Sequence, residues 1–343
     1  MIYEIYTQKI DELLELTKKK KEDVFLFDFS IYRNEFENVF SFYQEALERK
    51  KNYGIVKNIF YFNNCTTINA VASKENDVYT VSMNMGTIVY LIQTFLETDN
   101  LLDINKHKAI IEFEKLLDTS IQNLMYQNVV HYTFYHELAH LIQNSDSLLT
   151  SLEEKVNNKS IFSLESHILE LDADEFSALN IGAHLFDYAD RILGDRFNLF
   201  HFEILITLFG SSIFLYLKML QCDSVEIYLK EKSHPHSIIR FANIMFTLTR
   251  YCSNLLEYRG IFKSVSEKEI YLKILTFSDQ LSDIVLKNTH CASNYLKIFN
   301  DNYDNINGYF EEVNKEKQNN KSLAVFKRNQ IIKKTPPNNG YKI

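Results

Sequence analysis

The spacing of apolar residues places a short strand-forming stretch between two helical stretches. From about residue 3 to 50, apolar positions such as Ile10, Leu13 and Leu14 recur at helical intervals, around the strand-like run VFLFDF. From Asn58 the pattern changes to β-branched and aromatic runs, NIFYFNN, TTINAVAS and VYTVSMN, and the turn-forming sequence KEND separates the last two. From Gly86 to about residue 310, nearly every stretch has helical periodicity.

These elements predict an α+β fold that is mostly helical, with a small antiparallel sheet ahead of a helical C-terminal part. We expect an N-terminal helical cap at residues 1–58 and a main domain at residues 59–310. The remaining residues, 311–343, are polar and lysine-rich and hold two of the three prolines, so they predict a flexible basic tail.

Composition and charge narrow the class of protein. Hydrophobic residues make up 46% of the 343 residues and charged residues 24%, as in a folded protein with a core. The net charge of -8 gives no long-range positive potential, so we expect no nucleic-acid partner. The four cysteines lie far apart without a Cys-x-x-Cys pair, which favours reduced thiols in a cytoplasmic protein.

The chain gives little sign of export or of a membrane. Its amino terminus alternates charged and apolar residues and lacks the uninterrupted apolar core of a secretory signal. The run from Ile204 to Leu217 is uncharged, but its fourteen residues are short for a membrane span of about 20. This length favours a buried helix and a protein without a membrane partner.

The clearest chemistry lies in the helical stretch VVHYTFYHELAHLIQ. His136, Glu137 and His140 form the pattern H-E-x-x-H, which puts both histidines on one helix face, one turn apart. Their imidazoles can then bind one zinc ion. Glu137 lies about 100° round the helix, where it can act as general base and acid for a water molecule that attacks a peptide carbonyl.

A catalytic zinc ion usually takes three protein ligands, so a third is expected later in the chain. The segment SHILELDADEFSALN holds Glu170 and, one helical turn later, Asp174. We expect Glu170 to bind the zinc ion and Asp174 to hydrogen-bond a zinc-ligating histidine. His167, three residues before Glu170 on nearly the same helix face, is the alternative third ligand.

The segment SHPHSIIR offers two further histidines around a rigid proline. One of His234 and His236 could face the site and steady the oxyanion of the tetrahedral intermediate, or both could be surface residues at a helix start. Arg240 is expected to be the buried partner of an acidic group, either Asp174 or Glu170.

Four stretches together resemble zinc metallopeptidases of the gluzincin group, which carry H-E-x-x-H on one helix and E-x-x-x-D on a later one. HELAH and ELDADEFSA match these motifs, and INAVASKENDVYTVSMNMGTI resembles the strand, hairpin and glycine of the oligopeptidase/CAAX-protease-like branch. SHPHSIIR resembles the H-P-x-x-x-x-R element of that branch. The order of motifs is also similar to that of the Lit-type phage-exclusion peptidases, a soluble bacterial family associated with cleavage of a translation elongation factor.

The resemblance covers roughly residues 60–245 and implies a soluble intracellular zinc metalloendopeptidase, with one Zn²⁺ per chain, a protein or peptide substrate and a phage-exclusion or defence role. It implies that His234, which precedes the proline, is the histidine near the oxyanion. It also implies that Asn69 and Ala70 lie on an edge strand that binds the substrate backbone. The alternatives are a non-catalytic, zinc-stabilised regulatory or interaction protein and a helical binding module in which HELAH arose by chance.

Overall fold

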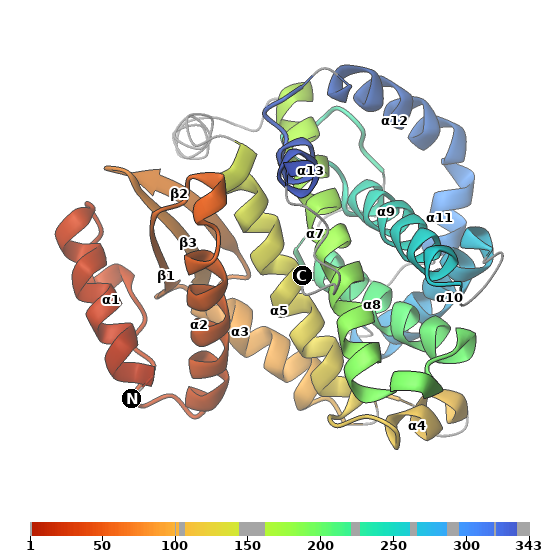
Figure 1. Ribbon diagram of the computed structural model, residues 1–343, viewed down its shortest axis with the longest axis horizontal. Coiled ribbons are helices and arrows are strands. Elements are labelled where there is room, and N and C mark those ends of the chain that lie inside the picture. The colour runs from red at the N-terminus through yellow and green to blue at the C-terminus, as the bar shows by residue number, and fades with distance from the viewer. Residues whose placement is uncertain are drawn as a thin grey trace. The chain divides into compact units, whose positions relative to one another are not determined.

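The computed structural model describes residues 2–99, 101–102, 107–143, 162–220, 227–260, 266–286, 295–318 and 320–334. These residues form mainly helices and one three-stranded sheet, which confirms the predicted, mostly helical α+β class (Figure 1). In chain order the elements are α1 (Ile2–Leu16), α2 (Arg33–Glu48), β1 (Lys57–Asn63), β2 (Ala70–Glu75), β3 (Val78–Asn84), α3 (Met85–Leu91), α4 (Lys108–Glu114), α5 (Ile121–Gln143), α7 (Leu164–Ile192), α8 (Leu199–Leu220), α9 (Ser237–Tyr258), α10 (Glu267–Val285), α11 (Tyr295–Asp301), α12 (Tyr303–Lys317) and α13 (Ala324–Lys334).

The chain forms two compact units. The first comprises the described residues among 1–92, 133–161 and 319–342, and the second those among 93–132 and 162–318. Within the first unit, α1 and α2 pack on β1, and the domain boundary expected at residue 58 stays a prediction. The run VFLFDF adds a single bridge between Val24 and Asn63 rather than a strand.

The sheet of the first unit is mixed, so the predicted antiparallel arrangement is wrong for one pair of strands. β2 and β3 form an antiparallel hairpin, whereas β1 and β3 run parallel, in the order β1-β3-β2. The turn residues Asn76 and Asp77 both have positive φ, as a two-residue hairpin turn requires. β3 takes the centre because nearly all of its residues are buried, while the more polar β2 lies at an edge.

Aromatic rings fill the core of the first unit. Phe36 of α2 packs edge-on against Phe62 of β1, with ring centroids 4.9 Å apart, and Tyr6 of α1 packs 4.7 Å from Phe27. Phe134, on the second half of α5, lies 4.6 Å from Tyr43 of α2. These contacts fix the second half of α5 against the N-terminal helices.

One glycine holds the loop between β1 and β2 in place. The Gly86 amide donates a hydrogen bond to the carbonyl of Cys65 at 2.9 Å. A Cβ atom at residue 86 would lie 2.0 Å from the Thr66 carbonyl oxygen, so only glycine permits this approach.

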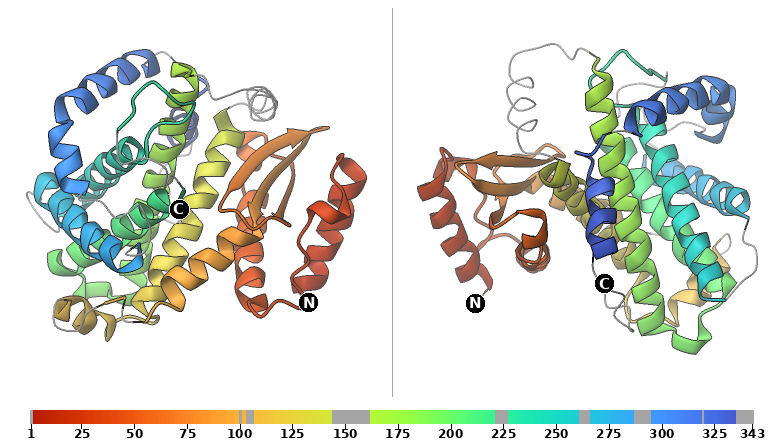
Figure 2. Two further views of the ribbon diagram at one scale, coloured as in Figure 1. Left: turned by 180° about the vertical axis from the view of Figure 1, so that it is seen from behind. Right: turned by 45° about the horizontal axis from the view of Figure 1, so that its top comes forward.

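The second unit is built from long helices packed side by side. α7 lies along α9, and α8 along α10 (Figure 2). Among the described helices, α8 alone is long and apolar enough to cross a membrane, and 78% of its most apolar window is buried inside the protein. Every residue from Ile204 to Leu217 is buried, which agrees with the core helix expected for this run.

Most described residues after Glu311 belong to two helices, α12 and α13, and the flexibility expected of residues 311–343 stays a prediction. The Tyr309 hydroxyl of α12 lies 2.7 Å from His167 Nδ1, and Lys317 pairs with Glu175 at 2.6 Å. These partners on α7 are distant in the sequence, so local composition did not reveal them. Residues 335–343 of the predicted tail lie outside the described residues.

Candidate metal centre

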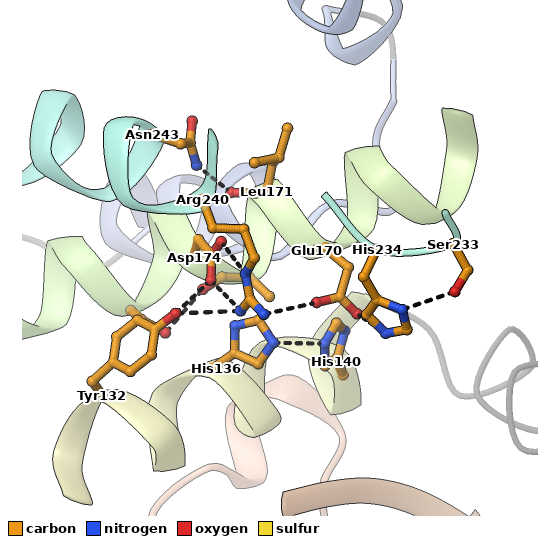
Figure 3. A network of polar contacts seen from close by, with 12 residues as sticks. Tyr132, His136, His140, Glu170, Leu171, Asp174, Ser233, His234, Arg240 and Asn243 are labelled. Atoms are coloured by element: carbon orange, nitrogen blue, oxygen red, sulfur yellow. Dashed lines mark hydrogen bonds and ion pairs between the residues drawn. The ribbon is translucent and has the colours of Figure 1, made fainter. Parts of the chain in front are cut away.

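The two histidines of the H-E-x-x-H motif point toward each other on α5. His136 Nε2 and His140 Nε2 are 3.2 Å apart (Figure 3). Two nitrogens bound to one tetrahedral zinc ion at their usual bond length would be about 3.3 Å apart. The pair therefore already has the spacing of two ligands of one ion. Glu137, the residue after His136, is only 8% exposed, so it is largely shielded from water.

Gln143 determines which nitrogen of His140 is available. Its side-chain oxygen Oε1 lies 2.9 Å from His140 Nδ1. A carbonyl oxygen only accepts hydrogen bonds, so Nδ1 is the protonated nitrogen and Nε2, which faces His136, carries the ring lone pair. This is the tautomer that a metal ion at Nε2 requires.

On α7, Glu170 lies between two basic side chains. Its Oε1 atom is 3.5 Å from His234 Nε2, and its Oε2 atom is 3.8 Å from Arg240 Nη1 (Figure 3). The Glu170 side chain is mostly buried, whereas His234 remains 37% exposed. A basic side chain thus lies near each oxygen of the Glu170 carboxylate.

Asp174, one turn after Glu170, is fully buried and bound by two residues. Arg240 donates to both of its oxygens, from Nε at 2.9 Å and from Nη2 at 2.7 Å, and Tyr132 donates at 2.6 Å. Burial opposes the charge of Arg240, but the Asp174 carboxylate raises the pKa of Arg240 well above its usual value. Burial, and then Asp174, raises the pKa of Tyr132, which stays a donor.

The sequence reasoning placed Arg240 beside Asp174 or Glu170, and the structure places it against both. It did not select Tyr132. The available signal was position, because Tyr132 lies four residues before His136 on the same face of α5. The predicted bond from Asp174 to a zinc-ligating histidine stays a prediction.

Three of the predicted residues form a group that could hold a metal ion. His136, His140 and Glu170 each offer one ligand atom, and these atoms lie within 4.8 Å of one another. His136 is buried and the other two are half-buried. Two imidazoles and one carboxylate form a donor set typical of catalytic zinc sites.

His167, the alternative third ligand, has both ring nitrogens engaged elsewhere. Nδ1 lies 2.7 Å from the Tyr309 hydroxyl, and Nε2 lies 2.8 Å from the Lys232 carbonyl. The residue is fully buried, and burial lowers its pKa. His167 therefore anchors the loop that carries His234, and Glu170 is the better third ligand.

The two histidines around Pro235 have different positions. His236 is the N-cap of α9, since its Nδ1 accepts a hydrogen bond from the Ile238 amide at 3.1 Å. His234 instead faces Glu170 and lies 3.0 Å from the Ser233 hydroxyl through Nδ1. Of these two histidines, His234 is the one that lies beside Glu170.

The two residues predicted to bind substrate differ in their backbone bonds. Asn69 donates from its amide to Thr87 Oγ1 and accepts from the Asn84 amide, both at 2.9 Å. In a hairpin with a two-residue turn, every second residue bonds to the partner strand, so Ala70 and Ala72 direct their backbone groups to the outer edge of β2. Ala70, but not Asn69, has the orientation for strand addition.

Comparisons with protein-family models, with curated proteins and with solved structures find no match to this chain. The resemblance drawn from the four motifs therefore stays a hypothesis.

Proposed function

We propose that this chain is a zinc metallopeptidase that hydrolyses peptide bonds of a protein substrate. The observation that carries the proposal is the group of His136, His140 and Glu170, with the buried carboxylate of Glu137 adjacent on the same helix. A zinc ion held by this group would lower the pKa of a water molecule and polarise the peptide carbonyl.

The contacts of the surrounding residues suggest a role for each of them in this reaction. Glu137 accepts a proton from the attacking water and delivers it to the leaving amine. His234, partly exposed beside Glu170, donates a hydrogen bond to the developing oxyanion. Arg240, fixed by its two bonds to Asp174, holds the Glu170 carboxylate in the orientation of a ligand.

An extended substrate segment would bind along the outer edge of β2. The backbone groups of Ala70 and Ala72 would pair with it. The reaction therefore suits a protein substrate that can present an unfolded or looped segment.

The proposal includes a cytoplasmic location and the phage-exclusion or defence role that the motifs suggest. Cys65 and Cys252 are free thiols, which is the usual state of cysteines in a reducing compartment. The defence role is supported only by the resemblance of the motifs.

The test compares the zinc-loaded wild type with Glu137→Gln on denatured cytosolic proteins, with new N-termini identified by mass spectrometry. We expect the wild type to generate new N-termini and Glu137→Gln to lose this activity by about 100- to 10,000-fold while keeping its zinc. Glu165→Gln, which changes an exposed carboxylate at the start of α7, is the control and should cleave like the wild type.

Two results would contradict the proposal. Equal cleavage by wild type and Glu137→Gln would remove the general base from the mechanism. Zinc bound by both proteins, with no new N-termini from either, would favour the non-catalytic, zinc-stabilised regulatory protein.

A further inference from the structure

The C-terminal helix α13 contacts the end of the helix that carries the H-E-x-x-H motif. The ammonium group of Lys327 donates hydrogen bonds to the Ile142 carbonyl at 2.6 Å and to the Gln143 carbonyl at 3.0 Å. Ile142 and Gln143 lie in the last described turn of α5. A positive charge there also complements the negative end of the helix dipole.

Gln143 connects this contact to the metal centre. Its backbone carbonyl accepts from Lys327, and its side-chain oxygen accepts from His140 Nδ1. The residue is 2% exposed. The same glutamine thus receives one bond from α13 and uses another to fix the ring of a proposed ligand.

We propose that α13 is a positioning element of the metal centre: Lys327 holds the last turn of α5 so that Gln143 keeps His140 with Nε2 directed to the metal ion. The inference rests on the proposed function and extends it, because it makes metal affinity depend on a segment more than 180 residues away in the chain. α13 is seated for this task, since Leu323 and Ala324 at its start are buried.

Loss of the Lys327 contact should change zinc affinity, which loss of an ordinary stabilising contact would not. Without Lys327, two carbonyls of buried residues lose a donor, so some stability is lost. The last turn would then be free to fray, and the His140 ring would sample the other tautomer or rotate. Zinc affinity should therefore fall in addition to any loss of stability, which a purely structural contact would not produce.

The experiment measures the zinc affinity of the full chain by competition with a chromophoric chelator, with Zn²⁺ alone as the probe. Gln143→Met, which keeps the size but removes the acceptor, should weaken zinc binding by about 10- to 100-fold. Gln143→Glu should keep near wild-type affinity, because a carboxylate also accepts from Nδ1. Lys327→Met should weaken binding several-fold.

A double variant tests the connection itself. If Lys327 acts through Gln143, then adding Lys327→Met to Gln143→Met should weaken zinc binding no further. The matched controls are Gln127→Met, an exposed glutamine on α5, and Lys333→Met, an exposed lysine on α13, and both should bind zinc like the wild type. Thermal unfolding of each metal-free variant separates positioning from stability.

Wild-type zinc affinity in Gln143→Met, or additive losses in the double variant, would overturn the inference and leave the proposed function in place. A lower melting temperature with unchanged zinc affinity would show a purely structural contact and also overturn it. If the wild type itself binds no zinc, the proposed function fails first and this inference fails with it.

Discussion

Helices α5 and α8 have nearly the same length, 23 and 22 residues, and both are largely buried, yet they bury different side chains. α8 buries mainly aliphatic and aromatic residues, with the ionisable His201 and Lys218 buried near its two ends. The buried hydroxyl of Ser212 bonds to the Phe209 carbonyl at 2.9 Å. α5 buries His136 and Glu137, which are ionisable.

The two helices therefore differ in the free-energy cost of burying their polar side chains. A hydroxyl that bonds within the protein is inexpensive to bury, whereas an ionisable group is costly unless it is paired, neutral or bound to a metal ion. A helix that packs equally well with apolar residues alone has no structural need for such groups. The adjacent buried pair His136 and Glu137 on α5 thus points to chemistry, whereas α8 buries ionisable groups near its ends and apolar side chains between them.

The largest effect expected from this comparison is the loss of metal binding in His136→Leu. Because His136 is a proposed zinc ligand, the variant should bind no zinc at micromolar concentration. The metal-free variant should keep the stability of the metal-free wild type or gain about 1 kcal/mol. Calorimetric zinc titration and urea unfolding with a chelator present measure the two quantities. A metal-free variant that is strongly destabilised would mean that His136 serves the fold.

The next largest effect comes from comparing two Arg–Asp ion pairs, one buried and one on the surface. Arg240→Met leaves Asp174 buried without its counter-charge and should cost about 3–5 kcal/mol of unfolding free energy. Arg259 pairs with Asp190 at 2.8 Å on the surface, so Arg259→Met should cost less than about 1 kcal/mol. Urea unfolding of both variants gives the difference, and similar losses would contradict the role of burial.

A smaller effect on stability is expected from a change in pH, through His131 on α5. Burial, and then the neighbouring His184, lowers the pKa of His131 from 6.5 to about 3. The unfolded chain therefore binds a proton that the folded chain excludes, and stability falls as the pH drops below about 6.5.

Between pH 7 and 5 the loss from this one group should be about 1–2 kcal/mol. The metal-free His131→Asn variant should lose correspondingly less stability over this range than the metal-free wild type. Identical pH dependence in the two proteins would show that His131 takes up its proton without unfolding.

The smallest effect is expected on the α8 side of the comparison. Ser211 accepts a hydrogen bond from Ser278 at 3.0 Å inside the core, so Ser211→Ala should cost about 1 kcal/mol. Ser282, whose hydroxyl is buried with no partner among the described residues, is the control, and Ser282→Ala should cost nothing. Equal effects in thermal unfolding would mean that these hydroxyls do not contribute through their bonds.

Local pattern was enough to predict the fold class, the three strands and the helix that carries His136, because periodicity and motif spacing are local properties. It also favoured Glu170 over His167, and Glu170 is the residue that lies with His136 and His140 in the group that could hold a metal ion. It could not give the parallel pairing of β1 with β3, which depends on the path of the chain between strands.

The residues that sequence reasoning missed have partners far along the chain. Tyr132 bonds to Asp174, 42 residues later, and Lys327 to the Ile142 carbonyl, 185 residues earlier. The same holds for α12 and α13, whose polar, lysine-rich sequence resembles a tail until their partners are known. Such contacts depend on tertiary packing, which no local composition encodes.

The central claim, that His136, His140 and Glu170 bind a catalytic zinc ion, is tested most directly by metal stoichiometry. Elemental mass spectrometry would be run on the folded wild type, on Glu170→Ala and on His167→Gln, a change that keeps hydrogen-bonding groups for Tyr309 and Lys232. We predict about one zinc ion per chain in the wild type and in His167→Gln, and its loss in Glu170→Ala. A folded wild type without metal, or zinc retained in Glu170→Ala, would contradict the account.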